Sequence, residues 1–213
     1  LIENIRFHKD EELNGSLFAK ELSKLGDIYI NEAFSCSHRS HASVCEITKH
    51  MDSYAGKLLI EEVNVINALN ESAKIPISCI IGGSKISTKI NVIYNLIKNV
   101  NNIVIVGAMA NNFLAYEGIK IGKSLVEKGS KKIISEIYAK AKENNCNILI
   151  PEDYNVSDTF EGSGQTKKKN AINDNEIILD IGPLTIKSIE NIIDQSNTVL
   201  WNGPAGYFEN KNF

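Results

Sequence analysis

Strand-like and helix-like segments alternate along the chain from Ile75 to the C-terminus. Short apolar runs are typical of buried strands, and apolar residues at three- and four-residue spacing are typical of amphipathic helices. The predicted strands are Ile77–Ile81, Ile103–Val106, Ile148–Ile150, Ile177–Ile181 and Thr198–Trp201. The predicted helices are Ile86–Lys98, Ala110–Glu117, Lys131–Asn144 and Leu184–Asp194. This alternation predicts an α/β fold whose mostly parallel sheet carries helices on both faces.

The part before Ile75 has a different pattern. It predicts a strand at Leu1–His8, a helix at Asn14–Leu25, a strand at Asp27–Asn31, a polar loop at Glu32–His41 and a long helix at Lys57–Ser72. The long helix could join two lobes. We therefore expect a first lobe at residues 1–55, an interlobe helix at 56–73 and a second lobe at 74–213. Within the second lobe, the run Lys167–Lys169 is expected to be an exposed loop.

A glycine corner follows the strand Ile77–Ile81. Gly82 and Gly83 leave room for a ligand beside the backbone, and a helix N-terminus provides free N–H groups for an anion. Lys85 and Lys89 are four residues apart, so they would share one helix face beside this corner. The corner suggests a phosphate site. Because short glycine motifs have many false positives, an ordinary β-α turn with solvated lysines stays open.

Glycine- and proline-rich corners also follow the other predicted strands. Together with the first they are Gly82–Lys85, Gly107–Ala110, Pro151–Asp153, Asp180–Pro183 and Asn202–Gly206. In open α/β sheets, ligands bind outside the carboxyl ends of the strands, so five corners on one edge predict one crevice. No G-x-G-x-x-G segment follows a strand, which disfavours a dinucleotide oxidoreductase.

Composition and charge exclude some classes of function. The 213 residues are 43% hydrophobic with a net charge of −3, so we expect no nucleic-acid partner. The apolar runs are too short to span a bilayer, and we expect no membrane partner. Leu1–Asn4 lacks the pattern of a secretory signal, and the four cysteines are scattered. We therefore expect a reduced, cytoplasmic protein.

Arginine is rare in this chain. Of 23 basic residues only Arg6 and Arg39 are arginines, and both lie in segments that resemble loops after strands. A guanidinium group is the donor that suits carboxylate or phosphate in a bidentate geometry. We favour an anion-binding role for both residues over chance placement.

Four metal-ligand residue types lie close together near Arg39. Cys36, His38, His41 and Cys45 fall within ten residues. Structural zinc sites usually pair close ligands across a longer spacer, so this crowding disfavours zinc. Anion binding by Arg39 with flanking histidines is the preferred interpretation.

Five segments resemble phosphoglycerate kinase in their residues, order and spacing. They are Leu1–His8 (LIENIRFH), Ser37–His41 (SHRSH), Gly82–Lys89 (GGSKISTK), Asp180–Pro183 (DIGP) and Trp201–Glu209 (WNGPAGYFE). The resemblance implies a two-lobe, monomeric enzyme of glycolysis with a Rossmann-like nucleotide lobe. It would transfer a phosphoryl group, with magnesium, from 1,3-bisphosphoglycerate to ADP, giving 3-phosphoglycerate and ATP.

The same resemblance implies roles for individual residues. Arg6 and Arg39 would bind phosphoglycerate, Lys85 would lie at the transferring phosphoryl group, and Lys89 would lie beside the nucleotide phosphates. Arg39, Lys85 and Lys89 are therefore the expected catalytic residues. The remaining nucleotide-binding residues would be Gly82, Gly83, Gly107, Asn202, Pro204 and Ala205, with Glu209 at the ribose and Leu125 and Leu179 at the adenine.

The chain departs from the family pattern in several places. Ser35 and Ala108 replace usual glycines, and Glu61 replaces a lysine that contacts nucleotide in many members. The early substrate segment and the late segment whose aspartate contacts the metal–nucleotide complex are both absent. We therefore expect a chain truncated at both ends, with kinase activity belonging to the complete enzyme. The alternative is an inactive nucleotide-binding remnant.

Overall fold

The computed structural model describes residues 1–213, apart from the side chains of residues 69–71. Two compact units make up the chain, Leu1–Ala73 and Lys74–Phe213. Among the described residues, no helix combines the length and the apolar character that crossing a membrane would require.

The first unit combines short elements around one parallel strand pair with one long helix. Its elements are a 3-10 turn Ile5–Phe7, α1 Lys9–Glu12, α2 Ser16–Ser23, β1 Ile28–Asn31, two further 3-10 turns Phe34–Cys36 and Glu46–Lys49, β2 Asp52–Ala55 and α3 Lys57–Ser72. The bounds of α3 are those predicted, and β1 lies where a strand was expected. The pattern missed β2, which pairs with β1 in parallel.

The strand expected at Leu1–His8 is wrong. The Asn4 side chain accepts a hydrogen bond from the N–H group of Arg6 (3.1 Å), and the chain then turns through Ile5–Phe7. An asparagine that bonds to nearby backbone offers an alternative to strand pairing. Arg6 therefore lies in a turn.

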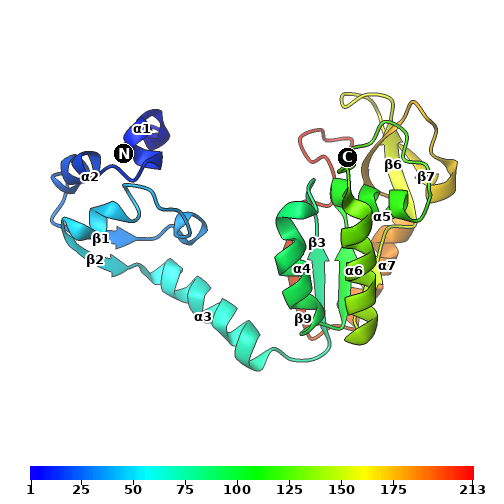
Figure 1. Cartoon of the computed structure of the whole chain (residues 1–213), viewed down its shortest axis with the longest axis horizontal. Helices are drawn as coiled ribbons and strands as arrows, with labels where there is room; N and C mark the ends of the chain where they lie inside the picture. Colours follow the sequence, from blue (N-terminus) through cyan, green and yellow to red (C-terminus); the bar gives the residue numbers. More distant parts are fainter. The chain divides into compact units, whose positions relative to one another are not determined.

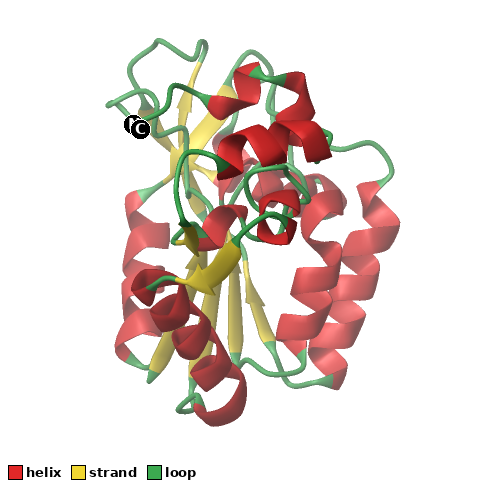
Figure 2. Ribbon diagram, turned by 90° about the vertical axis from the view of Figure 1, so that its left-hand side faces the viewer, coloured by secondary structure: helices red, strands yellow, loops and turns green.

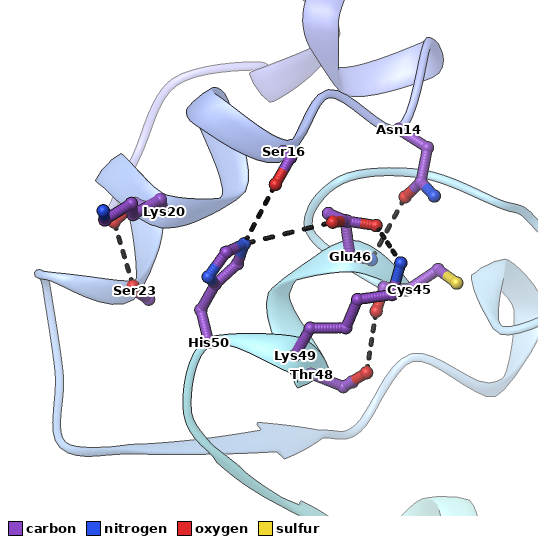
Figure 3. A network of polar contacts seen from close by, with 9 residues as sticks. All are labelled: Asn14, Ser16, Lys20, Ser23, Cys45, Glu46, Thr48, Lys49 and His50. Atoms are coloured by element: carbon purple, nitrogen blue, oxygen red, sulfur yellow. Dashed lines mark hydrogen bonds and ion pairs between the residues drawn. The ribbon is translucent and has the colours of Figure 1, made fainter.

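A small core and a polar network hold the first unit together. Ala19, Ala42 and Ile47 are buried in that core. Figure 3 shows the network that joins the start of α2 to the turn Glu46–Lys49: the Asn14 side chain accepts a hydrogen bond from the Glu46 N–H group (3.1 Å). Lys49 donates to the Glu46 carboxylate (2.7 Å), and this bond holds the pKa of Glu46 below its ordinary value.

The second unit contains the predicted parallel sheet. Its strand order is β5-β4-β3-β9, and every pairing is parallel. The bounds are β3 Ile77–Ile81, β4 Asn102–Ile105, β5 Asn147–Leu149 and β9 Thr198–Asn202. The α/β prediction is confirmed, and all four strands lie within one residue of their expected positions.

Helices cover both faces of this sheet (Figures 1 and 2). They are α4 Ile90–Ile97, α5 Ala110–Tyr116, α6 Ser130–Glu143 and α7 Pro183–Asp194. Because successive side chains of a strand point to opposite faces, Ile81 and Ile105 pack in the core with α4, α5 and α6, whereas Ile80 and Val104 pack with α7. This two-sided burial explains why the strands are nearly all apolar.

A second sheet in this unit is antiparallel, which the sequence did not predict. Its order is β7-β6-β8, with β6 Asp153–Ser157, β7 Gln165–Lys168 and β8 Ile177–Ile181. The expected parallel pairing of Ile177–Ile181 is therefore wrong. Polar residues along β6 and β7 conceal the strand pattern.

The expected exposed loop at Lys167–Lys169 is also wrong, because Lys167 and Lys168 belong to β7. The Lys167 Nζ atom donates to the Oε1 atom of buried Glu176 (2.5 Å). A largely buried lysine with a carboxylate partner satisfies its charge inside the fold.

We predict that Asp153→Ala destabilises the second unit. The Asp153 side chain is 1% exposed and accepts hydrogen bonds from the N–H groups of Leu184 (2.9 Å) and Thr185 (2.8 Å) at the start of α7. Losing a buried charged cap costs about 2 kcal/mol, to be measured by urea unfolding.

The matched control is Asp174→Ala. Asp174 forms an exposed ion pair with Lys120, and losing such a pair costs less than about 1 kcal/mol. Equal unfolding midpoints for the two variants would contradict the capping role of Asp153.

Candidate functional site

The carboxyl ends of three parallel strands are joined by backbone hydrogen bonds. The N–H group of Gly82, after β3, donates to the carbonyl oxygen of Asn202 at the end of β9 (2.8 Å). Gly107, after β4, donates to Ala205 (2.9 Å), and Met109 donates to Gly83 (2.8 Å). Three of the five predicted corners therefore form one connected edge.

The other two corners have different surroundings. The corner Pro151–Asp153 follows β5 of the same sheet, but Asp153 is used in capping α7. The corner Asp180–Pro183 begins within β8 of the antiparallel sheet, so the expectation of five corners on one sheet edge is wrong for this one. The Asp180 carboxylate nevertheless lies next to Gly206, since a Cβ atom on Gly206 would overlap it. Burial raises the pKa of Asp180.

Glycine is required where these backbones approach most closely. A Cβ atom on Gly82 would fall onto the carbonyl group of Pro204. Gly107 has φ +66°, and a Cβ atom there would lie 2.9 Å from both the Gly83 nitrogen and the Pro204 oxygen. The left-handed conformation and the crowding both exclude a side chain.

Lys89 lies at the junction of these corners. Its Nζ atom donates to the carbonyl oxygen of Gly82 (2.9 Å) and to the side-chain oxygen of Asn202. Both partners are uncharged, so the positive charge is held but not neutralised by them. Partial burial lowers the pKa of Lys89 from its ordinary value.

Lys85 has a different environment from Lys89. It is exposed, and the expectation that both lysines share a face of the following helix is wrong. Residues Ser87–Lys89 form a 3-10 turn, and α4 begins only at Ile90. Both lysines therefore belong to the segment that links β3 to α4.

A cavity of about 380 Å³ opens beside this segment. Its volume is within the usual range for small-molecule sites. Its walls combine apolar side chains with the glycine corners: Gly83, Ser84, Gly107, Ala108, Asn111, Leu125, Phe160, Ile177, Ile178, Leu179, Pro204, Gly206, Tyr207, Phe208 and Glu209. Such a cavity suits a flat apolar group that continues into a polar end at the glycines.

Buried Asn111 on α5 contributes an unpaired acceptor to this wall. Its Nδ2 atom donates to the carbonyl oxygen of Leu125 (3.1 Å), and its Oδ1 atom has no partner within the described residues. A buried polar atom without a partner is costly, and such atoms often pair with a water molecule or a ligand.

The structure gathers most of the predicted nucleotide-binding residues. Gly83, Gly107, Leu125, Leu179, Pro204 and Glu209 line the cavity. Gly82, Lys89, Asn202 and Ala205 lie in the hydrogen-bonded edge beside it. Sequence reasoning missed the walls formed by Asn111, Phe160 and Phe208, since loop aromatics and a buried amide carry no periodic signal.

The two arginines lie in the first unit. Both are exposed, and within the part of the chain that the structure describes neither guanidinium group has a hydrogen-bond or ion-pair partner. Arg39 lies in a loop whose far end is fixed by buried Glu11, which accepts hydrogen bonds from the N–H (3.0 Å) and Oγ (2.6 Å) groups of Ser43. The guanidinium groups are therefore free to bind an anion.

The residues considered for zinc have other surroundings. The His41 Nδ1 atom lies 3.5 Å from the Glu11 carboxylate. Over the described residues, no group of three or more His, Cys, Asp or Glu side chains lies close enough to hold a metal ion.

The three departures noted in the sequence are also located. Ala108 lines the cavity, Ser35 lies exposed in the turn Phe34–Cys36, and Glu61 is exposed on α3. Of these departures, Ala108 directly alters a wall of the candidate site.

Comparisons with known proteins agree on one family. The family model described as phosphoglycerate kinase matches residues 1–213. The phosphoglycerate kinase of Wolbachia pipientis subsp. Culex pipiens (strain wPip) is 48% identical over 215 residues, covering 100% of this chain and 54% of that protein. That of Maricaulis maris (strain MCS10) is 43% identical, with 100% and 53% covered. The chain spans about half the length of the curated relatives it matches.

Solved structures show the same similarity. The phosphoglycerate kinase from Coxiella burnetii matches with a TM-score of 0.76 and 36% identity, covering 97% of this chain and 54% of that one. The enzyme from Pyrococcus horikoshii OT3 has a TM-score of 0.79 at 24% identity, which indicates a shared fold.

We predict that Gly107→Ala destabilises the chain more than Gly118→Ala does. Both glycines have positive φ values, +66° and +79°, but a Cβ atom on Gly118 would have nothing within 4 Å. The Gly118 variant should lose about 1 kcal/mol from backbone strain alone, whereas crowding should add at least about 1 kcal/mol at Gly107. Urea unfolding of both variants measures the difference. Equal losses would contradict the close backbone approach at Gly107.

Proposed function

Because the chain belongs to the phosphoglycerate kinase family, we propose that its second unit binds ADP or ATP and that the complete enzyme interconverts 1,3-bisphosphoglycerate and ADP with 3-phosphoglycerate and ATP. The observation that carries this proposal is the position of Lys89. Its ammonium group lies near Gly83, which lines the cavity, and it donates to two uncharged partners, the Gly82 carbonyl oxygen and the Asn202 side chain. A phosphate at the glycine end of the cavity would supply the missing negative charge.

The cavity suggests how a nucleotide would be oriented. The base would lie between apolar walls that include Leu125 and Leu179. Glu209 lines the same cavity and is exposed, and an ionised carboxylate is an acceptor suited to the ribose hydroxyl groups. The phosphates would then reach the corners at Gly83 and Gly107, where the backbone leaves room for them.

The residue types also suit phosphoryl transfer. This reaction depends on in-line positioning and on positive charge near the equatorial oxygens, with little covalent work by the protein. We assign Lys85 to the transferring phosphoryl group, because it is exposed in the same segment as Lys89. We assign Arg6 and Arg39 to phosphoglycerate, for which a planar bidentate donor is suited. No general base is required, because the accepting oxygen of the nucleotide is already ionised.

Magnesium does not fit a site made by the described residues alone. They offer no group of three or more His, Cys, Asp or Glu side chains for a metal ion. A magnesium ion would therefore be brought by the nucleotide phosphates, where it would offset their charge. We further propose a cytoplasmic, monomeric protein.

Two measurements on the same preparation test this proposal. ADP is titrated into the chain by calorimetry, and ATP formation from 1,3-bisphosphoglycerate is followed in a coupled assay. Saturable ADP binding supports the nucleotide site, and turnover in addition supports the kinase reaction by this chain. Binding without turnover supports the alternative of a nucleotide-binding protein without catalysis. The absence of ADP binding would contradict the proposal.

We predict that Lys89→Met weakens ADP binding at neutral pH and removes its dependence on alkaline pH. A charged hydrogen bond contributes about 1.5–3 kcal/mol, equivalent to roughly 10- to 100-fold in affinity. Because burial lowers the pKa of Lys89, its ammonium group should lose its proton at a lower pH than an ordinary lysine does. Raising the pH should therefore weaken ADP binding to the unchanged chain.

Lys98→Met is the control for this prediction, since Lys98 is exposed at the end of α4. It should keep both the affinity and the pH profile of the unchanged chain. A Lys89→Met variant that behaves like this control would remove Lys89 from the phosphate site.

A further inference from the structure

A carboxylate outside the cavity holds the lysine-bearing segment. Glu127 lies in the connection between α5 and α6, and its two oxygens accept hydrogen bonds from the N–H group (3.0 Å) and the Oγ atom (2.6 Å) of Ser87. Ser87 lies midway between Lys85 and Lys89. The Glu127 carboxylate therefore holds the centre of this segment, although Glu127 and Ser87 are 40 residues apart in the sequence.

The Glu127 end of this contact is itself anchored. The N–H group of Glu127 donates to the Asn112 Oδ1 atom (2.8 Å), and the Asn112 Nδ2 atom donates to Met109 (3.2 Å). Next to it, Asn111 holds the carbonyl oxygen of Leu125 (3.1 Å). Two buried asparagines of α5 thus hold the connection that carries both the cavity residue Leu125 and Glu127.

The charge of Glu127 strengthens its hydrogen bonds to Ser87. The hydrogen bonds from Ser87 hold the pKa of the Glu127 carboxyl below its ordinary value, and the nearby positive charge of Lys85 acts in the same direction. Glu127 is therefore ionised at neutral pH. It is not among the residues that line the cavity, so it would act on a ligand through the segment Lys85–Lys89 that it holds.

We propose that Glu127 is a positioning residue for the phosphate-binding segment: by holding Ser87 it keeps Lys85 and Lys89 beside the strand ends, and it ties this segment to the Leu125 wall of the cavity. This inference rests on the proposed function. Glu127 would support recognition of the phosphate end of the nucleotide by Lys85 and Lys89, while the cavity walls would recognise the base.

The consequence is a selective loss. Glu127→Gln keeps the size of the side chain but replaces a charged acceptor with a neutral one, which weakens the hydrogen bonds to Ser87. ADP affinity should fall roughly 10-fold, the equivalent of about one charge-assisted hydrogen bond. Adenosine has no phosphate, and its affinity should stay within about 2-fold, since the contacts of Leu125 are unchanged.

The test is calorimetric titration. ADP and adenosine are each titrated into the unchanged chain, into Glu127→Gln and into Glu190→Gln. Glu190 is exposed on α7 and serves as the matched control. Hydrogen exchange is measured without ligand, and the Ser87 amide should exchange faster in Glu127→Gln while amides of β4 keep their rates. Glu127→Asp should recover part of the ADP affinity, because the charge is restored.

The outcomes separate the inference from the proposed function. If the unchanged chain binds ADP and Glu127→Gln binds both ligands as tightly, or loses both affinities in equal proportion, the positioning role is overturned. If the unchanged chain does not bind ADP, the proposed function fails and this inference fails with it. A fall in ADP affinity alone, with faster exchange at Ser87, supports the positioning role.

Discussion

The candidate site depends on the close approach of three backbones at the carboxyl edge of the parallel sheet. β3 lies between β4 and β9, and the segments that follow these strands are joined by hydrogen bonds from Gly82 to Asn202 and from Gly107 to Ala205. Gly82 and Gly107 cannot carry side chains here, so peptide groups supply many of the polar atoms of the junction. Because carbonyl oxygens repel anions, a positively charged group beside this edge favours the binding of a phosphate.

Lys89 is that group. It reaches back from the start of α4 to the carbonyl oxygen of Gly82 and the side chain of Asn202, which join its charge to both β3 and β9. Because these partners are neutral, the ammonium group remains available to a phosphate. The contact between Glu127 and Ser87 then explains how a lysine outside regular helix keeps its place. A remote carboxylate fixes the short 3-10 turn that carries it.

The sequence predicted the features that depend on local pattern. The bounds of β3 and α3 could be read directly, because β3 is buried on both faces and α3 is a long helix with apolar spacing. The antiparallel sheet could not, since many residues of β6 and β7 are polar and β6 pairs with β8 across the whole connection between them. The same limit applies to the site. The glycine corners and Lys89 were visible as a motif, whereas the aromatic wall at Phe160 and the carboxylate at Glu127 depend on long-range folding.

The central claim is that this backbone junction and its cavity bind nucleotide. Amide chemical shifts of the glycines, followed by NMR during addition of ADP, test it most directly because the glycines report their own surroundings. Gly83, Gly107 and Gly206 line the cavity and should shift, whereas Gly118 and Gly129, whose surroundings are open, should not. Saturable shifts at the first three, with none at Gly118 and Gly129, would agree with the account, and unchanged glycines at the cavity would contradict it.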